Sequence, residues 1–343
     1  MNCCAECFGD RGLRRSIIPL RATGVGRCDY CETPDVAVVV PAQLSEYFGL
    51  LVSSYQNAEN GQLLIHWFRE DWALFRNPRM DDPRAKDLLA EILDDGEVVR
   101  QNFVPRAAPV ANRLSEWEKL RDELMYQNRY FPAANIDLER LELLLSSLVL
   151  DSDEVPRHWY RARIQSGDTP FSIADMGAPP RRIASHGRAN PAGIPYLYLG
   201  SRPDTAISEI RPHTGEMACV ADFTTPETLK LIDLRSPRQM VSPFLLEDAT
   251  DIVRLRADLP FLERLGDELT RPVLPQSAAI DYTPSQYLCE FIKKCGYDGV
   301  VYRSSVSEGI NLALFNPELA ERGSVMQYRV SRVLVNIEAA AAF

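Results

Sequence analysis

The sequence lacks long apolar runs and is poor in lysine. No stretch approaches the roughly 18 uninterrupted apolar residues of a membrane-spanning helix, so we expect no membrane segment. Only five lysines stand among the 38 basic residues, and the net charge is -10. Phosphate backbones repel an acidic protein, which argues against a general nucleic-acid surface. The first residues show no positive segment followed by an apolar core, so we expect a cytoplasmic protein without a secretion signal.

The residues that are present make an ordinary globular mixture, with 45% hydrophobic and 25% charged among 343 residues. Because single hydrophobic cores stop growing near about 250–300 residues, this length predicts two or three domains. Five of the eight cysteines fall within the first 31 residues. The other three, Cys219, Cys289 and Cys295, stand in apolar surroundings, and we expect them to pack as small hydrophobic side chains.

Four of the early cysteines form two C-x-x-C pairs. Cys4 pairs with Cys7, and Cys28 pairs with Cys31, after an interval of 20 residues. Each pair brings two thiolates to one side of a tight turn, and two pairs complete a tetrahedral four-sulfur shell around zinc. The spacing matches the zinc-ribbon class and predicts a structural zinc knuckle over residues 1–34. A redox pair and coincidence are the alternatives, and Cys3 is an alternative to Cys4.

The region from 35 to 150 has a helical hydrophobic pattern and is expected to be an all-α domain. Apolar residues recur at helical spacing over 44–55. Asp82-Pro83 predicts the start of a second helix, since proline is favoured in the first turn. Ser115 with Glu118 fits a capping box, and Asn135 is expected to cap a fourth helix.

After an acidic linker at 151–154 the pattern changes to short strands mixed with helices. The strand-like segments are 158–164, 196–199, 217–223, 229–234, 297–303 and 310–315. The helical segments between them are 203–212, 245–257 and 284–295. This order predicts an α+β domain over 155–337 with a mostly non-local sheet.

The first strand-like segment, HWYRARI, carries two arginines on one face. The strand period of two places Arg161 and Arg163 opposite Tyr160, Ala162 and Ile164. Two neighbouring guanidinium groups repel each other unless an anion lies near them. These residues alone favour ion pairs with the protein's own carboxylates. A bound diphosphate is the alternative, because the planar arginine fork matches phosphate oxygens.

Three further segments carry a family resemblance. They are GRANPAGIPYLYL from Gly187, PDTAISEIRP from Pro203, and GYDGVVYRSS from Gly296 with GINL from Gly309. In order and spacing they resemble the RES family, named for an arginine, a glutamate and a serine, over about 157–317. The resemblance implies three catalytic residues, which are Arg161, Glu209 and Ser304. It implies a further set that binds NAD, which is Arg163, Arg188, Asn190, Tyr198 and Asn311.

The resemblance also implies an ADP-ribosyltransferase-like mixed sheet and an enzyme that cleaves the nicotinamide–ribose bond of NAD, by hydrolysis or phosphorolysis. Many members are toxin halves of bacterial toxin–antitoxin pairs, so an antitoxin, another regulatory protein or a second subunit is an expected partner. Transfer of ADP-ribose to a protein or nucleic acid is the alternative in the same fold. A zinc-anchored regulatory protein with an inactive domain is the alternative of another class, and intact Arg161 and Glu209 argue against it.

The expected chemistry assigns a task to each residue. Cleavage of the C1′–N bond develops positive charge on the ribose, and a carboxylate near the sugar hydroxyls stabilises it. Glu209 takes that task. Arg161, assisted by Arg188 or Arg163, would hold the diphosphate. Ser304 is expected to donate a hydrogen bond to nicotinamide or ribose.

Two features depart from what the resemblance implies. Relatives commonly carry an aromatic residue at the position of Ala189, so any stacking is expected to fall to Tyr196, Tyr198 or Phe171. The region 35–150 resembles HEPN-like helical domains, whose RNase members carry an arginine and a histidine four to six residues apart. The match here, Arg181 with His186, lies outside that region. We therefore expect residues 1–150 to regulate or position the enzyme rather than cleave RNA.

Overall fold

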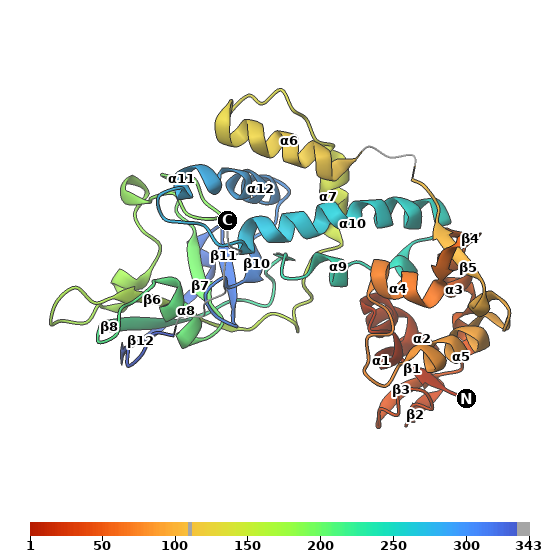
Figure 1. The fold of residues 1–343 in the computed structure, drawn as a ribbon. Coiled ribbons are helices and arrows are strands. Elements are labelled where there is room, and N and C mark those ends of the chain that lie inside the picture. The colour runs from red at the N-terminus through yellow and green to blue at the C-terminus, as the bar shows by residue number, and fades with distance from the viewer. Residues whose placement is uncertain (109–111, 335–343) are drawn as a thin grey trace, which may run out of the picture. The chain divides into compact units, whose positions relative to one another are not determined.

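The computed structural model describes residues 1–108 and 112–334 (Figure 1). The chain divides into two units. Unit 1 comprises Met1–Glu118 and Ser236–Arg264, and unit 2 comprises Lys119–Arg235 and the chain from Leu265 on. The segment Ser236–Arg264 therefore belongs with the N-terminal residues, although the sequence pattern groups it with the C-terminal ones. Residues 335–337, at the end of the predicted α+β domain, lie outside the described residues.

Unit 1 begins with a small antiparallel sheet that the sequence pattern did not predict. Its strands lie in the order β1–β3–β2 and are β1 (Cys3–Cys4), β2 (Gly24–Gly26) and β3 (Val36–Val39). Three short helical segments follow β1, which are α1 (Ala5–Phe8), the π-helix η1 (Leu13–Ile17) and α2 (Ile18–Arg21). The sheet places the first cysteine pair at the end of a strand and the second in the turn before β3.

The rest of unit 1 is mainly helical, although the region predicted to be all-α also contains strands. Its helices are η2 (Pro41–Leu44), α3 (Ser45–Val52), α4 (Leu64–Trp72), α5 (Asp82–Leu93), η3 (Val98–Arg100), α9 (Pro237–Met240) and η6 (Pro243–Leu245). They pack around Phe48, whose ring centroid lies 5.3 Å from that of Phe8, 6.4 Å from Phe68 and 4.8 Å from Phe244. Strands β4 (Tyr55–Leu63) and β5 (Asn102–Pro105) add a two-stranded sheet.

Helix α5 begins at Asp82 as predicted, with the side chain of Asp81 accepting from the Arg84 amide at 3.0 Å. The two other capping predictions are wrong. Asn112, not Ser115, caps α6 (Arg113–Tyr126), because its side chain accepts from the Ser115 amide. Asp137, not Asn135, caps α7 (Leu138–Ser146). Both predictions misplaced the helix start: Ser115 lies inside α6, and Asn135 lies two residues before the residue that caps α7.

Unit 2 is built on a seven-stranded mixed sheet, which confirms the predicted α+β fold (Figure 1). The strands lie in the order β12–β8–β6–β7–β11–β10–β9, with β9 and β10 parallel and the other pairs antiparallel. Their bounds are β6 (His158–Ile164), β7 (Leu197–Gly200), β8 (Met217–Thr224), β9 (Leu231–Asp233), β10 (Gly299–Arg303), β11 (Ile310–Leu314) and β12 (Glu321–Arg329). Strands β10 and β11 are buried on both faces, which explains their continuous apolar runs.

The helices of unit 2 are α7, η4 (Ile173–Met176), η5 (Arg181–Ile183), α8 (Pro203–Glu209), α11 (Ala278–Asp281), α12 (Thr283–Lys294) and η7 (Pro317–Leu319). Helix α10 (Ala249–Thr270) contributes residues to both units. A search of the described residues finds no helix with the length and hydropathy of a bilayer span. Strand β12 was not predicted, because most of its side chains are exposed and it shows no alternating pattern.

Candidate functional site

A cavity of about 450 Å³ lies in unit 2, beside the junction of β6 and β7. These strands share a single register pair, Tyr160 with Gly200, so the sheet opens next to it. Residues of both strands line the cavity, together with parts of α8, α11, the segment before β7 and the β10–β11 connection. The volume falls in the range of small-molecule sites, about 300–1,000 Å³.

Arg161 projects from β6 into this lining. Its Nη1 donates to the Tyr198 carbonyl at 3.3 Å, while its buried Nε has no partner within the described residues. Burial, and then the charge of Arg163, lowers the pKa of Arg161 to about 10, so the group stays charged at neutral pH. Arg188 and Arg211 line the same cavity. In the part of the chain that the structure describes, none of the three pairs with a carboxylate, which makes the cavity a suitable place for an anion.

Glu209 is the last residue of α8, and two donors hold its carboxylate. Oε1 accepts from the Ser304 hydroxyl at 2.7 Å and from Asn311 Nδ2 at 2.6 Å. Oε2 has no protein partner over residues 1–108 and 112–334. Helix α8 starts close to β7 because Gly200 has no side chain; a Cβ there would lie 2.8 Å from the Ala206 amide nitrogen. Glu209 and Asn311 both line the cavity, so a fixed carboxylate faces the arginines.

Ser304 contacts Glu209 but does not line the cavity. Its hydroxyl oxygen accepts from the amides of Val306 and Ser307, at 3.2 and 3.1 Å, in the turn after β10. With its oxygen engaged by these donors, the hydroxyl proton points to Glu209. The expected donation to a ligand is therefore replaced by donation to the carboxylate.

Arg188 and Tyr198 line the cavity as expected, whereas Asn190 does not. Arg188 donates to the Arg271 carbonyl at 2.8 Å, and its guanidinium lies 5.1 Å from the ring centroid of Tyr282. The Tyr198 hydroxyl donates to Asn190 Oδ1 at 2.7 Å. Asn190 is buried, and its amide donates to the carbonyls of three loop residues, which are Ser185, Pro191 and Ile194. Asn190 thus shapes the loop that carries Arg188.

Arg163 lies outside the cavity lining, although it was predicted to share a ligand with Arg161. Its guanidinium stacks 4.1 Å from the Phe171 ring centroid and donates to the Asp175 carbonyl at 2.6 Å. The reason is position along β6: Arg161 is next to the opening at Tyr160, and Arg163 is two residues farther along, where its exposed side chain contacts Phe171 and Asp175 instead. A cation–π contact and a carbonyl satisfy its charge without a phosphate.

The aromatic predictions need a similar correction. Phe171 is engaged by Arg163, and Tyr196 is buried with its ring centroid 4.9 Å from that of Phe315, so neither lines the cavity. Ala189 is fully buried and outside it as well. The tyrosines among the lining residues are Tyr160, Tyr198, Tyr282 and Tyr302.

Sequence reasoning missed Arg211, His186 and Tyr282 as lining residues. Arg211 follows Glu209 by two residues, and its φ of 49° turns the chain just after α8. That proximity was the available signal for Arg211. His186 was considered only as part of an RNase pair, and nothing in the sequence marks Tyr282, which reaches the cavity from the segment before α12.

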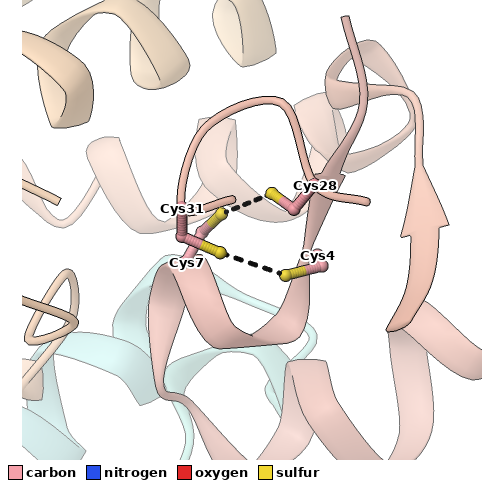
Figure 2. A group of neighbouring side chains, drawn as sticks. All are labelled: Cys4, Cys7, Cys28 and Cys31. Atoms are coloured by element: carbon pink, nitrogen blue, oxygen red, sulfur yellow. Dashed lines mark hydrogen bonds between the residues drawn. The ribbon is translucent and has the colours of Figure 1, made fainter. Parts of the chain in front are cut away.

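The cysteine cluster of unit 1 is a second candidate site (Figure 2). The sulfur atoms of Cys4, Cys7, Cys28 and Cys31 point toward one another and all lie within 4.8 Å of each other. Cys4 and Cys31 are 3.5 Å apart at Sγ, and Cys7 and Cys28 are 3.3 Å apart. Cys3 is outside the cluster and donates toward the Val39 carbonyl at 3.6 Å. All four thiols are buried, so this cluster can hold a metal ion.

The isolated cysteines show no such grouping. Cys219 and Cys289 are fully buried, and Cys295 is partly buried. Burial raises the pKa of the Cys289 thiol, which keeps it protonated. Cys289 therefore packs as the small hydrophobic side chain that was expected, whereas the Cys219 sulfur also accepts from the Phe171 amide at 3.4 Å and donates to Gln165 Oε1 at 3.5 Å.

Comparison with known proteins places the chain in a family through residues 158–331, which include Ser236–Arg264 of unit 1. No curated protein sequence matches the chain. Among solved structures, the crystal structure of the M. tuberculosis MbcT–MbcA toxin–antitoxin complex is similar, with 14% identity and a TM-score of 0.35, over 57% of this chain and 96% of that chain. A family model described as the RES domain matches residues 158–331, just over half of the chain. The chain therefore belongs to the RES domain family.

Proposed function

We propose that unit 2 is an NAD-consuming enzyme that cleaves the nicotinamide–ribose bond. One observation carries the proposal: a carboxylate held at one oxygen faces a cavity lined by Arg161, Arg188 and Arg211. NAD presents a diphosphate to such cations and a ribose that becomes positive during cleavage. Membership in the RES family supports NAD as the substrate class.

The arginines would bind the diphosphate. Arg161 has an unpartnered, buried Nε and is charged, so an incoming phosphate oxygen satisfies an atom that the described protein leaves without a partner. Arg188 and Arg211 are each held by a backbone carbonyl, that of Arg271 and that of Val273, so they are oriented before the ligand arrives. Binding energy from the diphosphate then orients the reacting bond.

Glu209 would stabilise the transition state. When the C1′–N bond breaks, its electron pair leaves with neutral nicotinamide, and the ribose gains oxocarbenium character. Since Ser304 and Asn311 hold Oε1, Oε2 is the oxygen that can accept from a ribose hydroxyl. Water or phosphate then bonds to C1′, and the attacking water loses a proton. Ser304 and Asn311 are positioning residues, because they act through Glu209.

The test is product analysis with the purified protein and NAD labelled separately in nicotinamide and adenylate. We expect free nicotinamide, and Glu209→Gln should lower its release on the order of 100-fold or more. Glu321→Gln, on the exposed strand β12 of the same sheet, is the matched control and should retain the parent rate. Near-normal release by Glu209→Gln would overturn the assignment. Label on protein or nucleic acid would identify a transferase instead.

The family resemblance also leads us to propose that the protein acts as a toxin restrained by a partner protein. A free NAD-consuming enzyme harms the cell that makes it, so a restraint is needed while the protein is stored. Co-purification of the chain from its native cell with a second protein that blocks nicotinamide release would support this, and full activity of the chain in its native cell would contradict it.

We further propose that the cysteine cluster holds one structural zinc ion. A zinc–sulfur bond of about 2.3 Å gives sulfur–sulfur separations of about 3.8 Å in a tetrahedron. The observed separations of 3.3 and 3.5 Å, within an overall limit of 4.8 Å, fit that shell. With four protein ligands no position is open for substrate, so the ion would stabilise the fold.

Elemental analysis of reduced protein tests this site. We expect one zinc per chain, lost in a Cys4→Ser/Cys31→Ser variant and retained in Cys3→Ser, which changes the adjacent buried thiol outside the cluster. Finding iron in place of zinc would change the identity of the proposed metal but keep the site, because a four-thiolate shell also suits iron. Absence of both metals would overturn the site.

Finally, we propose that residues 1–150, most of which belong to unit 1, regulate or position the enzyme. The pair Arg181 and His186 belongs to unit 2, so it provides no RNase site for unit 1. Nicotinamide release by full-length protein with and without its metal tests the proposal. A changed rate with an intact unit 2 supports it, and an unchanged rate in metal-free protein contradicts it.

A further inference from the structure

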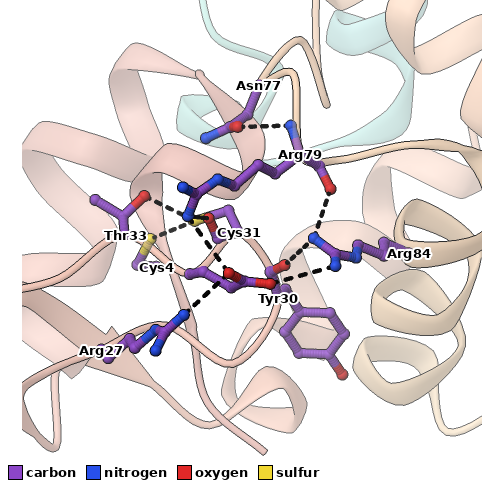
Figure 3. A network of polar contacts seen from close by, with 9 residues as sticks. Cys4, Arg27, Tyr30, Cys31, Thr33, Asn77, Arg79 and Arg84 are labelled. Carbon is purple, nitrogen blue, oxygen red and sulfur yellow. Dashed lines mark hydrogen bonds and ion pairs between the residues drawn. The ribbon is translucent and has the colours of Figure 1, made fainter.

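Three arginines meet one carboxylate beside the second cysteine pair (Figure 3). Glu32 follows Cys31 directly, and its carboxylate pairs with Arg27 at 2.9 Å, Arg84 at 3.3 Å and Arg79 at 3.6 Å. Three positive charges against one negative charge leave an excess of two positive charges at this point. The side chains of Arg27, Arg79 and Arg84 are 67%, 56% and 43% exposed, so solvent screens their mutual repulsion, and they can compensate a further negative charge beside them.

Two of these arginines also hold the cysteine turn itself. Arg79 Nη1 donates to the Cys31 carbonyl at 3.3 Å, and Arg84 Nη1 donates to the Tyr30 carbonyl at 3.3 Å. Arg84 lies in the first turn of α5, and Arg79 lies just before that helix. The backbone of Arg79 is fixed in turn by Asn77, whose Oδ1 accepts from the Arg79 amide at 3.0 Å. The cations are therefore brought to the cluster by a distant segment of unit 1.

The turn is also shaped to present Glu32 and a cysteine to these partners. Glu32 has a φ of 60°, a left-handed conformation that is unfavourable for a residue with a Cβ and persists where its surroundings hold it. The Thr33 side-chain oxygen lies 3.1 Å from Cys31 Sγ, where its hydroxyl can donate to a thiolate. The turn therefore holds Glu32 where the arginines meet it and places the Thr33 hydroxyl beside Cys31.

A divalent ion bound by four thiolates carries two negative charges, because the four thiolates exceed the ion's charge by two. We propose that Arg79 and Arg84, together with Arg27, compensate this dianion and thereby strengthen metal binding by the cysteine cluster. The inference rests on the proposed zinc site. A buried charge is costly without opposite charge and hydrogen bonds near it. Because Arg79 and Arg84 donate to the carbonyls of Cys31 and Tyr30, their charges lie beside the place where that dianion would form.

Zinc competition in full-length, reduced protein tests the inference, with a chromophoric chelator at fixed pH and salt. We expect Arg79→Gln/Arg84→Gln to weaken zinc binding about 10- to 100-fold, the usual effect of losing partners around metal ligands. Arg79→Lys/Arg84→Lys keeps the charges and should recover part of that loss. Arg100→Gln, an exposed arginine of unit 1 that pairs with Glu97, is the control and should bind zinc like the parent.

The outcomes separate three cases. A parent protein that binds neither zinc nor iron overturns the metal site and this inference with it. A parent that binds zinc, with a double Gln variant of equal affinity, overturns only the role of the arginines. If the double variant lowers the unfolding temperature of the loaded and metal-free forms equally, its role is structural and the inference also fails. If the double variant does not fold, the single variant Arg79→Gln is measured in its place. We expect this single variant to bind zinc more weakly than the parent.

Discussion

The cysteine cluster and the cavity differ in how far apart their residues lie along the chain. The cluster uses residues 4–31 of one small sheet and its turns. The cavity combines β6, the end of α8 and the β10–β11 connection, so Arg161 and Asn311 are 150 residues apart. Local geometry is sufficient for the first site, whereas the second exists only when the sheet has formed. The two sites should therefore respond differently to the same kind of change.

Removal of the metal is the change with the largest expected effect. A structural zinc ion contributes roughly 10–16 kcal/mol of apparent binding free energy to its small fold. In Cys4→Ser/Cys31→Ser we expect hydrogen exchange to increase over residues 1–34, while β6, β10 and β11 keep their protection. Equal loss of protection in the strands of unit 2 would show that the two sites are not independent in stability.

Expression in bacteria tests the second site in the cell. The intact chain should stop growth by depleting NAD, and Glu209→Gln should restore both growth and NAD, because the transition-state contact is lost. Cellular NAD measured before growth stops is the readout. Growth arrest with normal NAD would favour transfer of ADP-ribose. It would also show that the activity of the cavity residues does not deplete NAD in the cell.

Asp10 shows that unit 1 also contains a non-local contact. Its buried Oδ1 accepts from the Leu13 amide and the Ser242 hydroxyl, both at 2.8 Å. Burial raises the pKa of Asp10 from 3.8 to about 6, against the opposing effect of these bonds. Between pH about 4 and 6 the folded protein thus holds a proton that the unfolded chain releases, and the free energy of unfolding falls as pH rises through that window.

Asp10→Asn should remove this dependence, since asparagine does not titrate. Relative to the parent, the variant should gain stability as pH rises from 4 to 7, by up to about 3 kcal/mol for a shift of this size. Denaturant unfolding of both proteins at several pH values measures the difference. A difference that stays constant with pH would mean that Asp10 titrates normally in the folded protein.

The smallest expected effect concerns the two donors to Glu209. Ser304→Ala and Asn311→Ala should each lower kcat about 10-fold, consistent with the loss of one hydrogen bond to a charged group. KM for NAD should change less, because neither residue is assigned to the diphosphate. The double variant should deviate from additivity, since both donors reach Oε1. A rise in KM with unchanged kcat would instead place them in substrate binding.

Several predictions failed where local patterns offered more than one solution. The caps at Asn112 and Asp137 lie near other residues able to accept from a free amide, and only the helix start selects between them. Arg163 shares a strand face with Arg161, but only the tertiary structure decides that Arg161 lines the cavity while the exposed Arg163 contacts Phe171. Strand β12 pairs with β8 through backbone groups. Its side chains are mostly exposed, so they show no hydrophobic pattern from which a strand could be predicted.

The sequence by itself determined the features that depend on near neighbours or on ordered motifs. These are the grouping of Cys4, Cys7, Cys28 and Cys31, the mixed-sheet domain, and the assignment of Arg161 and Glu209 to one family pattern. Only the tertiary structure decided that Ser304 and Asn311 donate to the same oxygen of Glu209, that Arg211 and Tyr282 complete the cavity, and that Arg79 and Arg84 reach the cysteine turn. The physical reason is that hydrogen bonds and charge pairs act over a few ångströms in space, and separation along the chain does not specify which distant residues the fold brings within that range.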